Sequence, residues 1–215
     1  MVVVGAQRPI TAISSDGPLN LVNAVRVAAA PDSKGKGVLI VLNDQISSAR
    51  FVGKTNTYRL ETFHSWEFGF LGFADADRVV YYQAPLRRHT LDSEFDVTNV
   101  SEFARVDILY AFAGDDGTLV EAAVDAGAGG IVVAGVGAGS TNRMKDALAA
   151  AAKKGVVVVR SHRLFGGRVL TDDNWAAPGF VSADNLSPQK ARVLLLLALT
   201  KTRNPAEIQR MFNIY

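Results

Sequence analysis

The feature that most constrains the fold is a regular alternation of apolar runs and helical segments between residues 106 and 160. The apolar runs 106–111, 130–134 and 156–160 have strand character. The segments between them, 118–126 and 142–154, have helical spacing, and a glycine follows each of them. Strands that alternate with helices pair in parallel, because each helix carries the chain back along the sheet. We therefore predict a small parallel-sheet domain over residues 105–215.

Two further helices are predicted to complete this domain. One begins at Ser187-Pro188 and carries the apolar run Val193–Leu199, since proline favours the first turn of a helix. The other begins at Asn204-Pro205-Ala206-Glu207, which has the spacing of a capping box.

Residues 1–82 predict a second, partial α/β domain. Val2–Val4 and Val38–Leu42 are typical of buried strands, and a helix is predicted to begin at Asp16-Gly17-Pro18 between them. Its inward face is predicted from apolar residues at helical spacing, which are Leu21, Val22, Val25 and Ala29. Residues 50–82 are rich in aromatic residues and threonine with scattered glycines, a pattern that indicates loops and an antiparallel hairpin. Residues 83–104 are polar and almost without periodicity, so we predict that they link domains 1–82 and 105–215.

The composition excludes several classes of function. Lysine and arginine number 23 against 21 aspartates and glutamates, so the basic face that nucleic-acid binding needs is not expected. The longest fully apolar run, Val193–Leu199, is much shorter than the roughly 20 residues of a membrane-spanning helix. The sequence has no cysteine, which excludes disulfides and thiolate catalysis but leaves the redox compartment open. His64, His89 and His162 lack metal-binding spacing, so we expect neither a metal site nor a cofactor.

Three local patterns are candidates for chemistry. The turn Gly135–Ser140 follows a strand and precedes a helix, so it is either an anion-binding loop or, as we favour, a tight turn at the carboxyl edge of the sheet. His162, at a strand end, is either a base or, as we favour, a solvated surface residue. Lys54, between Gly53 and Thr55-Asn56-Thr57, is either an ordinary surface lysine or an amine held away from water that can act as a base.

Several short motifs follow one another in a fixed order along the chain. They are Val4-Gly5-Ala6-Gln7-Arg8-Pro9, Ser15-Asp16-Gly17-Pro18, Lys54-Thr55-Asn56-Thr57, Ala134-Gly135-Val136-Gly137, Val158-Val159-Arg160-Ser161 and Pro188-Gln189-Lys190-Ala191-Arg192. In this order they resemble the bacterial L-asparaginases, and the type II group in particular. The resemblance covers the whole chain and implies a larger N-terminal α/β domain followed by a smaller, flavodoxin-like C-terminal domain.

The resemblance also implies an activity and a site. The family hydrolyses the side-chain amide of L-asparagine through an acyl-enzyme on a threonine, and L-glutamine is a second candidate substrate. Lys54 stands at the family's catalytic lysine, and Ala6 stands where the backbone lines the substrate cleft. In the family a neighbouring subunit completes the site with an asparagine and a glutamate, so a homo-oligomer is implied. Ser140 stands at the place of that asparagine, and Asp172 or Asp173 is the nearest acidic residue to the place of that glutamate.

Two family motifs that carry the threonines, T-G-G-T-I and H-G-T-D-T, precede the V-G-A-x-R-P block with which this sequence begins. We therefore expect little hydrolysis by this chain alone, because Lys54 has no nucleophile to deprotonate. We also expect exposed sheet edges at Val2–Val4 and Val38–Leu42. A non-catalytic assembly partner and a small-molecule binder that uses Gly135–Ser140 remain as alternatives. The type II resemblance suggests the periplasm or secretion.

Overall fold

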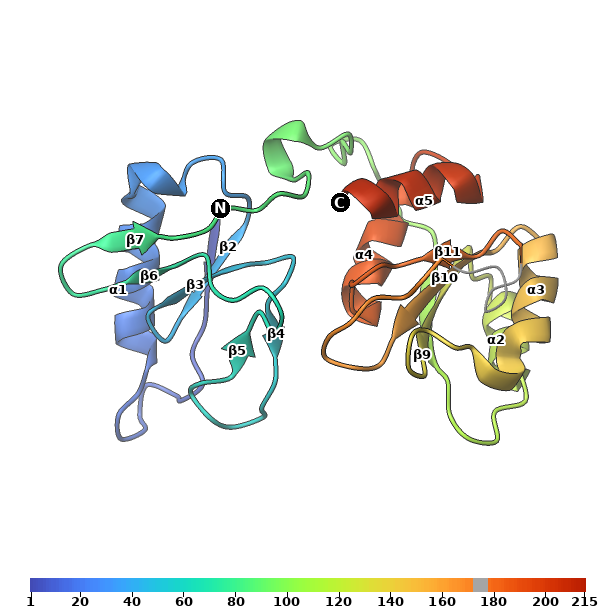
Figure 1. Cartoon of the computed structure of the whole chain (residues 1–215), viewed down its shortest axis with the longest axis horizontal. Helices are drawn as coiled ribbons and strands as arrows, with labels where there is room; N and C mark the ends of the chain where they lie inside the picture. Colours follow the sequence, from blue (N-terminus) through green and yellow to red (C-terminus); the bar gives the residue numbers. More distant parts are fainter. Residues whose placement is uncertain (172–177) are drawn as a thin grey trace. The chain divides into compact units, whose positions relative to one another are not determined.

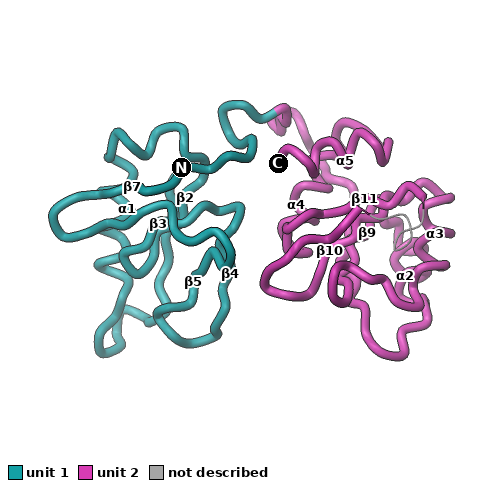
Figure 2. The backbone as a smooth tube through the Cα atoms, in the orientation of Figure 1, with its two compact units in different colours: residues 1–93 teal, residues 94–215 magenta. Residues whose placement is uncertain are grey.

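A computed structural model describes residues 1–171 and 178–215 and divides the chain into two compact units, Met1–Ser93 and Glu94–Tyr215 (Figure 2). The division falls inside the segment 83–104, which the sequence predicts to be a linker. Within the described residues, no helix combines the length and the apolar character that crossing a membrane requires. The overall class is α/β, as predicted.

The first unit is built on a mixed sheet with the strand order β1-β2-β3-β6-β7 (Figure 1). β1 (Val2–Val4) and β2 (Leu39–Leu42) pair in parallel through α1 (Gly17–Ala29), which confirms the predicted strand–helix–strand unit. The remaining strands pair antiparallel and are β3 (Gln45–Ser48), β6 (Gly72–Ala74) and β7 (Val79–Tyr81). A separate antiparallel ribbon joins β4 (Gly53–Lys54) to β5 (Phe63–His64), and two short 3₁₀ helices are η1 (Pro31–Ser33) and η2 (Thr90–Asp92).

One strand of this sheet was not predicted, and it changes the expected edges. β2 turns directly into β3 at Asn43 and Asp44, whose φ angles of 52° and 61° give the tight turn of a hairpin. Because β3 covers β2, the exposed edge expected at Val38–Leu42 is wrong. β1 lies at the end of the strand order, so in this unit its outer edge has no partner among the described strands.

The prediction of which face of α1 points inward is also wrong. Leu21, Val22 and Val25 are 58%, 54% and 61% exposed. The buried residues of the helix are instead Asn20, Asn23, Ala24 and Val27. Hydrogen bonds determine this orientation, because Asn20 Nδ2 donates to Gly5 O at 3.0 Å and Asn23 Nδ2 donates to Asp44 Oδ1 at 2.7 Å. A buried amide with partners is tolerated, whereas turning the helix would break both of these hydrogen bonds.

The second unit is the predicted parallel-sheet domain (Figure 1). Its strands lie in the order β11-β10-β9-β8, all parallel, and comprise β8 (Val106–Tyr110), β9 (Gly130–Gly135), β10 (Val157–His162) and β11 (Val181–Ser182). One face packs on α2 (Thr118–Asp125) and α3 (Lys145–Lys153), which follows the 3₁₀ helix η3 (Asn142–Met144). The other face packs on α4 (Pro188–Leu199) and α5 (Pro205–Ile214). Alternate residues along the strands pack against the two helix layers, so the sheet is covered on both sides.

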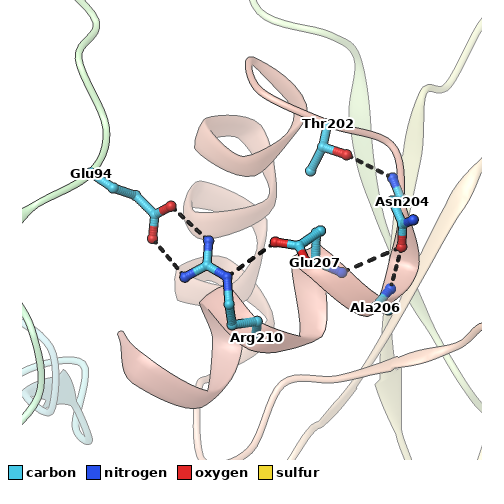
Figure 3. A network of polar contacts seen from close by, with 6 residues as sticks. All are labelled: Glu94, Thr202, Asn204, Ala206, Glu207 and Arg210. Carbon is cyan, nitrogen blue, oxygen red and sulfur yellow. Dashed lines mark hydrogen bonds and ion pairs between the residues drawn. The ribbon is translucent and has the colours of Figure 1, made fainter.

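Residues of α5 and Tyr215 contact Glu94, the first residue of this unit. Asn204 Oδ1 accepts from the backbone N–H groups of Ala206 and Glu207 at 2.9 and 3.4 Å, which confirms the predicted start of α5. Arg210 on α5 forms ion pairs with both Glu94 and Glu207 (Figure 3). Together with the Glu94 N–H, which donates to Tyr215 Oη at 2.6 Å, these contacts attach the last part of the predicted linker to the second unit.

Candidate active site

Lys54 lies on the short ribbon of the first unit. It pairs with Phe63 in the register between β4 and β5. Directly after it the chain turns back through residues 55–62, and Thr62, which is 1% exposed, closes that turn. Thr62 Oγ1 accepts from Asn56 N at 2.8 Å and donates to Asn56 O at 2.6 Å. The ribbon therefore places Lys54 directly before a hydrogen-bonded turn.

The small polar residues after Lys54 serve the turn and not the lysine. Thr55 Oγ1 donates to Thr62 O at 3.0 Å, and Asn56 Oδ1 accepts from Tyr58 N and Arg59 N at 2.9 Å each. Their side chains replace backbone pairing where the ribbon ends. The sequence signal at Thr55-Asn56-Thr57 thus reflects local structure around the candidate base.

The amino group of Lys54 has two neighbours in this unit. Nζ donates to Gln7 Oε1 at 3.1 Å, and it lies 6.0 Å from the centroid of the Phe63 ring. The residue is exposed in this unit, which agrees with the first of the two alternatives, a surface lysine, and not with an amine held away from water. An exposed amine is accessible to a substrate, and the contact with Gln7 places it beside the segment that follows β1, which includes Ala6.

Asp16 holds the segment that follows β1 in place. Its carboxylate accepts from the Gln7 N–H at 3.0 Å, from the Arg8 N–H at 2.8 Å and from Asn20 Nδ2 at 2.9 Å. Asp16 is the N-cap residue of α1, yet its side chain makes no capping bond to the helix. Burial alone would raise the pKa of Asp16, but these hydrogen bonds to the charged form hold the pKa below the ordinary value of 3.8.

This hydrogen-bonded carboxylate gives a pH-dependent prediction. Because the pKa of Asp16 is lower in the folded chain, its stabilisation is complete above the ordinary value of 3.8 and is lost as the pH falls through the folded value. We expect Asp16→Asn to reduce amide-exchange protection at Gln7 and Arg8 about fivefold near neutral pH, and the difference from the unsubstituted chain to narrow once the pH is lowered below 3.8. The measurement is amide hydrogen exchange, with rates corrected for intrinsic pH dependence. An equal difference at both pH values would contradict the assignment.

In the second unit, Gly135–Ser140 is a tight turn at the carboxyl edge of the sheet, the alternative that the sequence analysis favours. Ser140 N donates to Val136 O at 2.9 Å, and Val136 N donates to Ser140 O at 3.0 Å. Gly139 N also donates to Val136 O, at 3.2 Å. These N–H groups are satisfied by the turn itself, so they are not free to cradle a phosphate.

A buried arginine supports the same turn. Arg160 is 2% exposed, and its guanidinium donates to Gly139 O at 3.1 Å and to Ala138 O at 3.5 Å. Ser140 is half-buried, and its Oγ accepts from Asn142 N at 3.3 Å. The hydroxyl therefore lies at a rigid place on the edge of the sheet, where α/β domains commonly bind ligands.

The remaining candidates have different outcomes. His162 is 3% exposed, so its prediction as a solvated surface residue is wrong; its Nδ1 contacts Leu164 O at 3.0 Å. It is buried because it ends β10 in register with Gly135 of the central strand β9. Asp172 and Asp173 lie outside the described residues. Within the described residues, no group of three or more histidine or acidic side chains is placed to hold a metal ion.

The structure thus brings together Lys54 and the segment containing Ala6, both in the first unit. It also adds two residues that sequence reasoning missed, Gln7 and Asp16. Asp16 had a signal only for the beginning of a helix, whereas its hydrogen bonds run back to Gln7 and Arg8, nine and eight positions earlier. Gln7 had none, because nothing in a sequence shows that residue 7 meets residue 54.

Comparison with known proteins gives matches along the chain. The family model "Asparaginase, N-terminal" matches residues 1–87, and the model "Glutaminase/Asparaginase C-terminal domain" matches residues 105–212. L-asparaginase 2 of Bacillus subtilis is 51% identical over 216 residues, covering 100% of this chain and 57% of the relative. L-asparaginase 2 of Escherichia coli is 47% identical over 218 residues, covering 100% of this chain and 63% of the relative. A glutaminase-asparaginase of Pseudomonas fluorescens is 43% identical, covering 99% of this chain and 59% of the relative. The chain thus spans about three fifths of the length of these relatives.

Proposed function

Since the chain belongs to the asparaginase/glutaminase family, we propose that it forms part of an amidohydrolase that converts L-asparagine to L-aspartate and ammonia. The observation that carries the proposal is the 51% identity to an L-asparaginase over the whole chain. The accessible amino group of Lys54, held beside the segment containing Ala6, supports it. L-glutamine is proposed as a second substrate, because a similar relative is named glutaminase-asparaginase.

In the proposed reaction Lys54 is the base. Its neutral amine takes the proton of a threonine hydroxyl as the threonine oxygen attacks the amide carbon. The proton passes to the amide nitrogen, the C–N bond breaks, and ammonia leaves as the acyl-enzyme forms. Water then hydrolyses the acyl-enzyme to the acid and restores the threonine hydroxyl. The threonine motifs implied by the family resemblance lie outside this sequence. The backbone at Ala6, which Asp16 fixes through the N–H of the next residue, is proposed to line the substrate cleft.

The second unit is proposed to serve the site of another subunit in a homo-oligomer. Ser140 supports this role because it is half-buried on a turn that Arg160 and the turn's own backbone hold rigid. Its hydroxyl is proposed to hydrogen-bond the substrate where the family has an asparagine, and Asp172 or Asp173 is proposed for the place of the family's glutamate. The proposed domains are 1–82 and 105–215, joined by residues 83–104.

The proposal is tested by ammonia release from L-asparagine. We expect the 215-residue chain alone to match a buffer blank, because Lys54 then lacks a nucleophile. We expect a chimera, in which the unmatched part of the Bacillus subtilis relative is joined to this chain, to release ammonia well above the blank. The unmatched part alone serves as the control. A folded chimera that remains at the blank rate would overturn the proposed function.

A further inference from the structure

We propose that Gln7 is the positioning residue of Lys54: its side-chain oxygen fixes the amino group of the lysine beside the loop that follows β1. This inference rests on the proposed role of Lys54 as a base and deepens it. It starts from the observed contact between a loop residue and a strand residue that are 47 positions apart.

The side chain of Gln7 is committed to the lysine. Among the described residues, its only side-chain hydrogen bond joins Oε1 to Lys54 Nζ at 3.1 Å, whereas its Nε2 is buried and has no partner. A glutamine that served only the fold would be expected to satisfy its buried amide nitrogen against the backbone. The side chain of Gln7 therefore has one described polar function, and that function is to hold Lys54.

The chemistry of the two groups determines how they meet. A lysine amino group has only N–H donors when it is charged, so the amide must face it with its oxygen. When the amine is neutral it still has N–H groups and also one lone pair. A single N–H bonded to Gln7 Oε1 restrains rotation of the amine and leaves the lone pair to accept a proton. Gln7 can thus orient the base in both protonation states without taking the proton itself.

Gln7 is itself held by a chain of hydrogen bonds. Its N–H donates to the Asp16 carboxylate at 3.0 Å, and that carboxylate also accepts from Asn20 Nδ2 at 2.9 Å. Asn20 is 2% exposed, and its Oδ1 accepts from the N–H of Asn43 at 2.9 Å. The position of the lysine is therefore connected through a buried amide to the turn between β2 and β3.

On its other side, Lys54 faces an aromatic ring. Phe63 is its cross-strand neighbour, with the ring centroid 6.0 Å from Nζ, at the outer limit of a cation–π contact. This contact is weak and has no strong directional preference for one N–H group. Among these two neighbours, Gln7 is the one that can set the orientation of the amino group.

The test follows the reactivity of single lysines in the full 215-residue chain and needs no catalytic turnover. Amines are labelled with trace acetic anhydride, and the rate at Lys54 is measured by mass spectrometry relative to Lys145, an exposed lysine of the second unit. An amino group that is held by a hydrogen bond is less free to meet the reagent, so loss of that bond speeds labelling. We expect Gln7→Met, which keeps the length but removes the acceptor, to raise the relative rate at Lys54 about threefold or more. We expect Gln7→Glu, which keeps an acceptor and adds a charge, to lower the rate below that of the unsubstituted chain.

Two further measurements distinguish a specific effect of Gln7 on Lys54 from a general disturbance of the first unit. Lys36, whose Nζ lies 4.9 Å from the Tyr81 ring centroid in the same unit, should label at the same rate in every variant. Gln7→Asn, whose shorter side chain withdraws the oxygen, should behave like Gln7→Met and provides the test if the methionine substitution does not fold. An unchanged Lys54 rate in Gln7→Met or Gln7→Asn, or equal rises at Lys54 and Lys36, would overturn the positioning role. Neither result would bear on the proposed function, which the ammonia assay tests separately.

Discussion

Lys54→Met in the chimeric enzyme is expected to lower asparagine turnover at least about a hundredfold while the protein stays folded. A general base contributes roughly 10²–10⁴-fold to a rate, and methionine retains most of the length of the side chain without any proton acceptor of comparable strength. The fold should persist because Lys54 is exposed, and the turn that follows it is closed by Thr62 and Asn56 without the lysine. The measurement is the rate of ammonia release at saturating asparagine, with circular dichroism as the check on folding.

The matched control is Lys36→Met. Lys36 is also a lysine of the first unit with its amino group near an aromatic ring, 4.9 Å from the centroid of Tyr81. Its loss should leave turnover within about twofold, since it is not placed in the site. A chimera that hydrolyses asparagine at full rate with Lys54→Met would remove the lysine from the mechanism.

The two units differ in how well the sequence predicted them, and the reason is physical. In the second unit the central strands β9 and β10 are buried along their whole length, so Val132 and Val158 belong to unbroken apolar runs. Glycines such as Gly127 and Gly155, with φ of 84° and 87°, end the helices. In β9 and β10 the predicted strands agree with the structure to within two residues at each end. The order of the predicted helices and strands, the parallel pairing and the beginning of α5 were confirmed, whereas the short edge strand β11 was not predicted.

In the first unit polar contacts override the apolar pattern. The spacing of Leu21 and Val25 predicts an inward face, but Asn20 and Asn23 are buried and hydrogen-bonded, and so turn α1 the other way. The strand Gln45–Ser48 was missed because it is short and follows a turn of only two residues, Asn43 and Asp44. Such outcomes depend on which groups meet across the fold, and a periodicity does not carry that information.

The residues of the candidate site show the same difference between what a sequence pattern indicates and what depends on contacts across the fold. Lys54 and Ala6 were found through family resemblance, because short motifs retain their order. The contact between Lys54 and Gln7 was not, because it joins a strand residue to a loop residue 47 positions away by a single hydrogen bond. His162 was misplaced because a polar residue at a strand end resembles a surface residue, although register with the central strand buries it.

Gly139→Ala is expected to destabilise the second unit by about 2–4 kcal/mol. Gly139 has a φ of 90°, and a Cβ built on it would lie 2.7 Å from Val169 Cγ1 and 3.3 Å from the Ser161 carbonyl oxygen. The positive φ costs roughly 1 kcal/mol or more for a residue with a Cβ, and overpacking a buried site adds about 1–3 kcal/mol. The measurement is the exchange protection of the β9 and β10 amides in the full chain.

Gly137→Ala in the same turn separates these two costs. Gly137 has a φ of 53°, but a Cβ there would meet no atom within 4 Å, so we expect only the conformational cost of about 1 kcal/mol. Val169→Ala should recover part of the loss in the Gly139→Ala chain, because it removes the two methyl groups that the new Cβ would strike, and it should recover nothing in the Gly137→Ala chain. Equal losses for the two glycine substitutions would show that backbone conformation alone, and not close packing against Val169, requires glycine in this turn.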